Sequence, residues 1–112
     1  MKYGVYIPIF GPFGDARTII DIARETEAAG WDGLFIWDQI TGFQADNVVD
    51  NQVALTAIAM TTERIKFGIM ITPLARRRPP KYARAMLSLD HLSNGRLICG
   101  VGLGRNFASL IW

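Results

Sequence analysis

The chain has few of the residues on which metal sites, disulfides and thiol chemistry depend. Its 112 residues include one cysteine and one histidine. A single cysteine excludes an intrachain disulfide, and Cys99 has no second cysteine or nearby histidine with which to form a metal site or a nucleophilic pair. We therefore expect no metal. Because Cys99 lies inside an apolar run, we expect its side chain to pack in the core.

Long apolar runs and a strong charge are also missing. No stretch approaches the ~18 apolar residues of a membrane span, and the N-terminus lacks the apolar region of a secretory signal. The net charge of +2 is too small to indicate a nucleic-acid partner. The one dense basic run, residues 76–78, precedes a predicted helix where an anion could bind, but such runs are more often solvated loops. We expect a cytoplasmic protein with no nucleic-acid or membrane partner.

Short apolar runs alternate with helix-like segments along the whole chain. Runs such as GLFIW and LICGV are continuously apolar, which is typical of parallel strands buried on both faces. Asp15 and Asp50 are suited to cap helices, Pro79-Pro80 to begin one, and Gly30 to end one. The predicted strands are residues 3–9, 33–37, 65–72 and 96–102, and the predicted helices are about 15–29, 50–62 and 79–92.

The order of these elements is β-α-β-α-β-α-β, with strand starts spaced by roughly thirty residues, as in successive βαβ units. Such alternation predicts an α/β fold with a parallel sheet and right-handed crossovers. Two architectures fit the pattern, a doubly wound open sheet and part of a (β/α)8 barrel. A complete barrel needs ~250 residues, so residues 1–112 would form a single half-barrel domain.

Candidate functional residues lie after the predicted strands, because ligands of parallel α/β sheets bind at the C-terminal strand ends. Asp38 directly follows GLFIW, where its carboxylate could act as a base or hydrogen-bond a ligand ring; the alternative is a turn residue that closes the strand. The run GVGLG after the last strand is similar to a dinucleotide-binding fingerprint. However, Arg105 occupies the place of the third glycine, and no helix with a ribose-binding acid follows. We interpret these glycines as allowing close approach to the strand.

Three motifs together carry a resemblance to a known family. In order, AGWDGLFIWDQI, TTERIKFGIMITPLARRRPPKYAR and LDHLSNGRLICGVGLG resemble the N-terminal half of the bacterial luciferase-like monooxygenase superfamily, which comprises flavin- and deazaflavin-dependent oxidoreductases. The resemblance covers residues 1 to about 104. It implies half of a TIM barrel that uses FMN or the deazaflavin coenzyme at its C-terminal mouth. The implied reaction is hydride transfer or oxygen insertion on a small-molecule substrate.

The same resemblance implies roles for individual residues. Asp38 matches the acidic position of the family's Asp–His pair and is the expected catalytic residue, while Gln39 replaces the histidine and cannot transfer protons. Met70, Ile71 and Thr72 match a strand end that often carries a non-prolyl cis peptide beside the cofactor, here expected at Met70–Ile71. The expected cofactor contacts are Phe10, Gln39, Met70, Ile71, Thr72, Gly104 and Asn106.

A half barrel would leave two strand edges unpaired and one apolar sheet face uncovered. Such edges and faces recruit partners, so we expect the chain to associate with itself, two half barrels closing on each other. The family's later strands usually supply the phosphate side of the cofactor site, and they follow the part that this chain resembles. The alternative to an enzyme is therefore a non-catalytic, self-associating half-barrel module that binds no cofactor.

Overall fold

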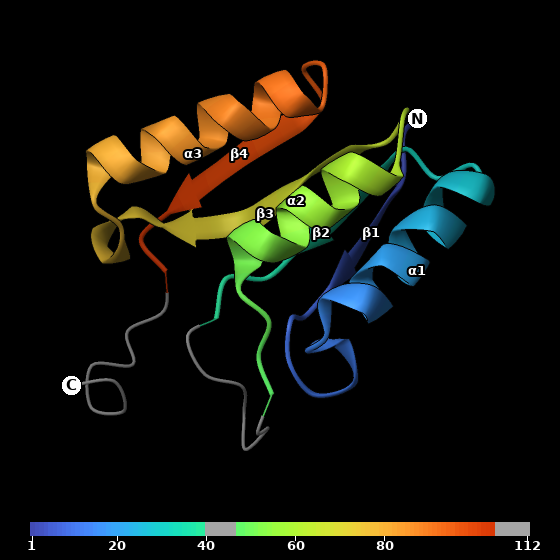
Figure 1. The fold of residues 1–112 in the computed structure, drawn as a ribbon, viewed down its shortest axis with the longest axis horizontal. Coiled ribbons are helices and arrows are strands. Elements are labelled where there is room, and N and C mark those ends of the chain that lie inside the picture. Colours follow the sequence, from blue (N-terminus) through green and yellow to red (C-terminus); the bar gives the residue numbers. More distant parts are fainter. Residues whose placement is uncertain (40–46, 105–112) are drawn as a thin grey trace.

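Four parallel strands form one sheet in the order β1-β2-β3-β4 in the computed structural model, which describes residues 1–39 and 47–104 (Figure 1). Helices connect each strand to the next, so the predicted alternation is confirmed, with ends shifted by one or two residues. The strands are β1 (Gly4–Ile7), β2 (Gly33–Ile36), β3 (Lys66–Pro73) and β4 (Leu97–Gly102). The helices are α1 (Ala16–Ala28), α2 (Asn51–Thr61) and α3 (Pro79–Leu92), with 3-10 turns η1 (Gly11–Phe13) and η2 (Leu74–Arg76).

The helices begin and end at the capping residues that the sequence predicts. The Asp15 carboxylate accepts a hydrogen bond from the Arg17 backbone N–H at 3.0 Å, and Asp50 likewise caps α2. Past the end of α1, Gly30 adopts a φ of +88°, which residues with a side chain rarely reach. Local sequence therefore determines where these helices begin and end.

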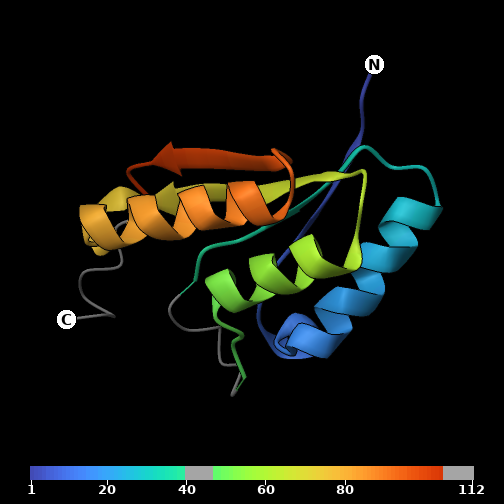
Figure 2. The same ribbon diagram turned by 45° about the horizontal axis from the view of Figure 1, so that its top comes forward.

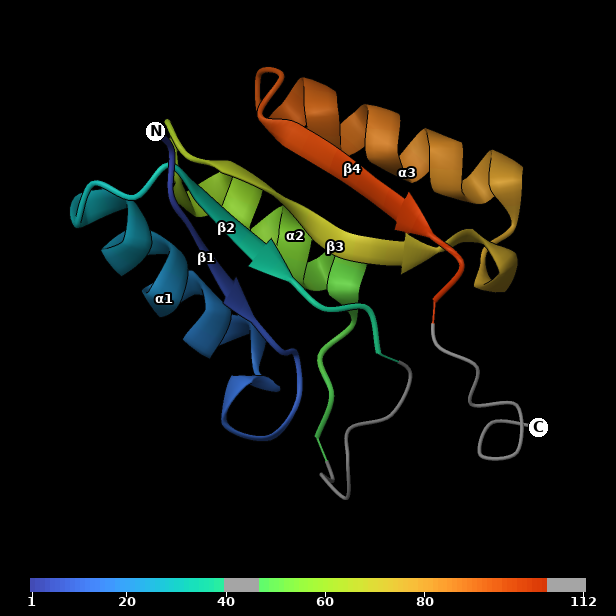
Figure 3. The same cartoon turned by 180° about the vertical axis from the view of Figure 1, so that it is seen from behind.

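All three helices lie on one face of the sheet (Figures 1, 2 and 3). Right-handed crossovers that always advance to the next strand place every helix on the same side. A doubly wound sheet reverses its direction at a switch point and carries helices on both faces. The strand order β1-β2-β3-β4 excludes that reversal among the described strands. The fold is thus part of a (β/α)8 barrel, and the alternative of an open dinucleotide-binding sheet is wrong.

The hydrophobic core fills the layer between the sheet and the helices. Alternate residues of β2 and of the first half of β3 point into this layer, and the helices supply the opposing side chains. Its fully or almost fully buried members include Leu34, Ile36, Phe67, Ile69, Ile19, Leu55, Ile58 and Leu89. The opposite face, the inner face of the half barrel, leaves Tyr6, Met70 and Ile98 exposed.

Cys99 is exposed, so its predicted place in the core is wrong. The reason is its position on β4, the last strand of the sheet, which has a neighbouring strand on one side only in the part of the chain that the structure describes. The thiol still lies against Tyr82 of α3, and partial burial raises the pKa of Cys99. A raised pKa keeps the thiol protonated near neutral pH, which does not favour a nucleophile.

Arg96 lies at the start of β4 and is buried, with 8% of its surface exposed. Its guanidinium donates five hydrogen bonds of 2.8–3.0 Å. The acceptors are the backbone carbonyls of Ala59, Thr62, Ile65 and Ser93 and the hydroxyl of Thr62. One side chain thereby joins the end of α2 and the starts of β3 and β4.

Glu27 of α1 has a similar structural role at the turn between α2 and β3. Its carboxylate accepts hydrogen bonds from the backbone N–H groups of Glu63, Arg64 and Ile65 at 2.8–3.1 Å. Burial alone would raise the pKa of Glu27, but these hydrogen bonds and the nearby charge of Arg64 outweigh it. The net pKa of Glu27 is lower than its ordinary value of 4.5.

We expect Glu27→Gln to lower the free energy of unfolding by about 1–2 kcal/mol at neutral pH, since a charged acceptor of three N–H groups is lost. A carboxyl with a lowered folded pKa stabilises above its unfolded value, and that contribution disappears as the pH falls through the folded pKa. The difference between wild type and variant should therefore shrink below pH 4.5. Urea unfolding at several pH values measures it, with the exposed Glu25→Gln as the control; a difference that is independent of pH would contradict this account.

Candidate active site

The C-terminal ends of the strands lie at one end of the sheet (Figure 3). At this end Asp38 and Arg77 form an ion pair. Asp38 follows β2, and Arg77 lies between η2 and α3. Arg77 Nη2 donates to Asp38 Oδ2 at 2.6 Å. The Asp38 side chain is 1% exposed and that of Arg77 27% exposed, so the ion pair is largely shielded from water. A hydrogen bond between a guanidinium and a carboxylate is short and strong, and it fixes the orientation of the carboxylate.

The second carboxylate oxygen of Asp38 is buried and has no hydrogen-bond partner among the described residues. A buried charged acceptor without a donor is costly, and native proteins rarely leave one unsatisfied. Asp38 also lines a cavity of about 330 Å³. The other residues around that cavity are Gln39, Val48, Val49, Asp50, Asn51 and Arg77. The arrangement suits a ligand that brings an N–H or O–H group to Asp38.

An aromatic cluster lies next to Asp38. The ring of Trp37 is 5.9 Å from that of Tyr6 and 5.7 Å from that of Phe10, measured between centroids. Trp37 Nε1 is a second buried polar atom for which the described part of the chain offers no acceptor. Burial raises the pKa of Tyr6, whose neutral hydroxyl donates to the Met70 carbonyl oxygen. Phe10, a predicted contact, thus lies against the residue that precedes Asp38.

The peptide bond between Met70 and Ile71 is cis, as the family resemblance predicts. Both side chains are exposed although they belong to the inner strand β3. They are therefore accessible to a ligand at the mouth. Their contact with a cofactor stays a prediction.

Thr72 and Gly104, two further predicted cofactor contacts, have surroundings that differ from those of Met70 and Ile71. Thr72 is fully buried, and its hydroxyl oxygen accepts a hydrogen bond from Tyr82 of α3 at 3.3 Å, so it packs a strand against a helix and does not reach the mouth surface. Gly104 is exposed with a φ of +76°, and a Cβ there would lie 2.6 Å from Pro73 Cβ. Only glycine fits that close approach. Asn106 lies outside the described residues.

Arg77 is the site residue that the sequence prediction missed. It belongs to a run of three arginines whose most common interpretation is a solvated loop, whereas one member forms the ion pair with Asp38. The only signal was the position of the run after a strand and before a helix. Asp50 lines the same cavity, but its carboxylate is used as the cap of α2, with bonds of 2.9 and 3.1 Å to the N–H groups of Gln52 and Val53.

The described residues contain no group of three or more histidine, cysteine, aspartate or glutamate side chains that could hold a metal ion. None of the helices in residues 1–39 and 47–104 is long and apolar enough to cross a membrane.

Comparison with curated proteins finds relatives of two kinds. The F420-dependent glucose-6-phosphate dehydrogenase of Amycolatopsis mediterranei is 31% identical over 98 residues, which are 85% of this chain and 28% of the relative. The limonene 1,2-monooxygenase of Rhodococcus erythropolis is 38% identical over 86 residues, which are 77% of this chain and 22% of the relative. The chain thus spans less than a third of the length of either relative.

Comparison with solved structures also finds a monooxygenase and an F420-dependent enzyme. The oxygenating constituent of 3,6-diketocamphane monooxygenase from Pseudomonas putida, in complex with FMN, matches 97% of this chain and 31% of its own with a TM-score of 0.81 and 26% identity. The coenzyme F420-dependent tetrahydromethanopterin reductase of Methanopyrus kandleri matches 93% of this chain and 27% of its own, with a TM-score of 0.78 and 27% identity. The family model for luciferase-like monooxygenases matches residues 1–112. The chain therefore belongs to the luciferase-like monooxygenase family.

Proposed function

We propose that this chain provides part of the active site of an FMN- or deazaflavin-dependent oxidoreductase that acts on a small-molecule substrate, with Asp38 at its centre. The observation that carries the proposal is the buried oxygen of Asp38 that has no partner among the described residues and lies beside a cavity at the barrel mouth. The relatives support both cofactors, since some are named for F420 and one structure contains FMN. The chemical class is therefore a redox reaction, with hydride transfer and oxygen insertion both open.

The residues at the mouth fit a flat heterocyclic ring. Asp38 would accept a hydrogen bond from a ring N–H or from a substrate O–H, and Gln39 could donate or accept one beside it. Met70 and Ile71 offer exposed apolar surface to a ring face. When bound, such a ring supplies the hydride or oxygen chemistry. The protein supplies binding, orientation and electrostatics.

The ion pair determines what Asp38 can do. Because Arg77 occupies one carboxylate oxygen, the other is held as a charged acceptor in a fixed orientation. An ionised carboxylate shielded from water can bind a donor strongly and can take a proton from a substrate hydroxyl. Gln39 cannot exchange protons, so its role is restricted to orienting a ligand.

The alternative is a non-catalytic half-barrel module. It is favoured by one observation, the match to less than a third of each relative's length. In the barrel family the phosphate group of a ligand is commonly bound by loops after strands 7 and 8. The strands among the described residues are β1 to β4, so such an anchor is not part of the described structure.

A fluorescence titration with the cofactor distinguishes the oxidoreductase from the non-catalytic module. We expect the purified chain to change the fluorescence of FMN or of the deazaflavin coenzyme in a saturable titration, with the mass of the assembly measured in the same samples. Saturable binding of either ring supports the oxidoreductase. If neither ring binds in any assembled state, the chain is a module without a cofactor.

A further inference from the structure

We propose that Tyr6 is a positioning residue of the ligand site, because its hydroxyl fixes the Met70–Ile71 segment against which a ligand ring packs. Gly102 of β4 assists by leaving the space that the Ile71 side chain occupies. The inference rests on the proposed function in one respect, the binding of a ring at the barrel mouth. The contacts that carry it join strands that the structure describes.

The mouth end of β3 departs from regular strand pairing. β2 and β3 pair as far as Ile36 and Ile69, and the pairing of β3 with β4 shifts its register between Ile69 and Thr72. Among the described strands, no pair in either ladder includes Met70 or Ile71. Such irregularities aim side chains in new directions and are frequent next to active sites. The position of this segment therefore needs a constraint other than a neighbouring strand.

Tyr6 of β1 supplies that constraint. A backbone carbonyl outside a ladder needs a donor from elsewhere, and the Tyr6 hydroxyl donates a hydrogen bond to the Met70 carbonyl oxygen, two strands away. Burial raises the pKa of Tyr6, so the hydroxyl keeps its proton near neutral pH and remains a donor. The ring of Tyr6 lies 5.9 Å from that of Trp37, which follows the intervening strand β2. Tyr6 is thus oriented by an aromatic neighbour and connects β1 to the end of β3.

Gly102 leaves room for the side chain of Ile71. A Cβ at Gly102 would lie 2.5 Å from Ile71 Cδ1, which is closer than two such atoms approach. Gly102 is not one of the glycines with a positive φ, so its backbone conformation does not require glycine. The requirement is space for a close approach. Because the conflict involves only the end of a flexible side chain, an alanine at this position would displace Ile71 with little effect on the backbone.

The segment that these contacts hold is the apolar surface proposed for the ring. Met70 is 46% exposed and Ile71 is 38% exposed in the described chain, at the mouth end of β3. A binding site is effective when supporting contacts hold its residues to within about 0.5 Å of the required geometry. Loss of the Tyr6 hydroxyl or displacement of Ile71 should therefore change how well a flat ring fits.

Nuclear magnetic resonance of the ligand-free protein tests the contact itself. Met70 and Ile71 form the only Met-Ile pair in the sequence, so labelling methionine carbonyl carbons and isoleucine amide nitrogens gives one correlated signal. We expect Tyr6→Phe to move the Met70 carbonyl signal upfield, as loss of a hydrogen bond to a carbonyl oxygen does. An unchanged signal overturns the proposal.

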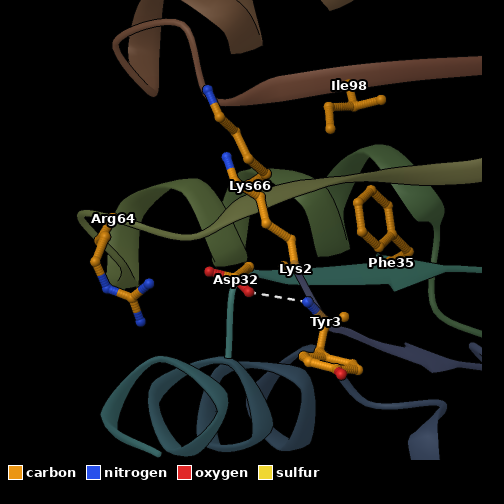
Figure 4. Close-up of a pocket in the computed structure, with 9 residues that line it drawn as sticks. Lys2, Tyr3, Asp32, Phe35, Arg64, Lys66 and Ile98 are labelled. Atoms are coloured by element: carbon orange, nitrogen blue, oxygen red, sulfur yellow. Dashed lines mark hydrogen bonds between the residues drawn. The ribbon is translucent and has the colours of Figure 1, made fainter. Parts of the chain in front are cut away.

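Tyr3→Phe is the matched control, since it removes the same hydroxyl at the opposite end of β1. There Tyr3 contacts the start of the neighbouring strand through its backbone, whose N–H donates to Asp32 Oδ2 at 2.9 Å (Figure 4). This variant should leave the Met70 carbonyl signal unchanged.

Fluorescence titrations with FMN and with the deazaflavin coenzyme test the positioning role. We expect Tyr6→Phe to weaken ring binding about 2- to 10-fold, the factor that corresponds to one neutral hydrogen bond. The absorption maximum of the bound ring should shift as well, because the surface against the ring has moved. Tyr3→Phe should bind the ring with the affinity and the spectrum of the wild type.

Two glycine variants separate positioning from stability. Gly102→Ala should weaken ring binding and leave the midpoint of urea unfolding unchanged, because only the Ile71 side chain has to move. Gly100→Ala instead places a Cβ 2.6 Å from the backbone oxygen of Ile69 and should lower that midpoint.

The outcomes distinguish this inference from the proposed function. If the wild type binds a ring and Tyr6→Phe binds it with the same affinity and absorption spectrum, the proposed function stands and the positioning role is overturned. The positioning role is also overturned if the affinity of Tyr6→Phe falls only where the variant has begun to unfold, because the hydrogen bond is then structural. If the wild type binds neither ring, the proposed function fails and the positioning role fails with it.

Discussion

Replacement of Arg96 by methionine is expected to lower the free energy of unfolding by about 3–5 kcal/mol. Methionine fills much of the volume but leaves five acceptor positions without their donor. Among them are the carbonyls of Ala59, Thr62 and Ile65, at the end of α2 and the start of β3. A buried carbonyl that loses its partner costs about 1–3 kcal/mol. The loss is comparable to the whole stability of a small domain.

Urea unfolding followed by circular dichroism measures this loss. Arg84→Met on the exposed surface of α3 is the matched control and should change the free energy of unfolding by less than about 0.5 kcal/mol. Arg96→Lys should recover only part of the stability. The single ammonium group of lysine cannot contact all the acceptors that the planar guanidinium group of arginine contacts at once. A methionine variant as stable as the control would show that water or local rearrangement satisfies the carbonyls.

The elements of this fold could be predicted because their signals are local. Asp15, Asp50 and Pro79 mark helix starts through capping and ring geometry, and the apolar runs mark buried strands. The pattern left two architectures open. The strand order excluded the doubly wound sheet. That order depends on which strands become neighbours and not on any residue within a strand.

The residues that the sequence did not identify have roles that depend on distant partners. Arg96 begins a strand like any surface arginine, yet its acceptors lie up to 37 positions away. Arg77 has two arginine neighbours with the same local sequence context, and only the fold brings it to Asp38. Cys99 was predicted to be buried and is exposed, because side-chain exposure on an edge strand depends on which of its faces are covered. Asp38 was identified because strand ends carry function in parallel sheets.

We expect Asp38→Asn to weaken binding of the cofactor ring about 10- to 100-fold, if the proposed function holds. The side-chain amide can turn its oxygen to Arg77, which places an NH2 group where the free carboxylate oxygen is now. A charged acceptor thereby becomes a donor, and the loss of one hydrogen bond to a charged group, about 1.5–3 kcal/mol, gives this factor. Ring fluorescence titrations measure the affinity. Asp21→Asn, on the exposed side of α1, is the control and should bind as the wild type does.

Stability measurements on the same variants separate a ligand-binding role from a structural one. Since one oxygen of Asp38 has no partner in residues 1–39 and 47–104, Asp38→Asn should change the free energy of unfolding by less than about 1 kcal/mol. Arg77→Met instead leaves a buried carboxylate without its counter-charge and should cost about 1–3 kcal/mol. The double variant should be more stable than Arg77→Met alone, because a buried amide costs less than a buried charge. If Asp38→Asn destabilises the fold as much as Arg77→Met and leaves the affinity for the cofactor ring unchanged, the ion pair has a structural role. Asp38 is then not part of a binding site at the barrel mouth.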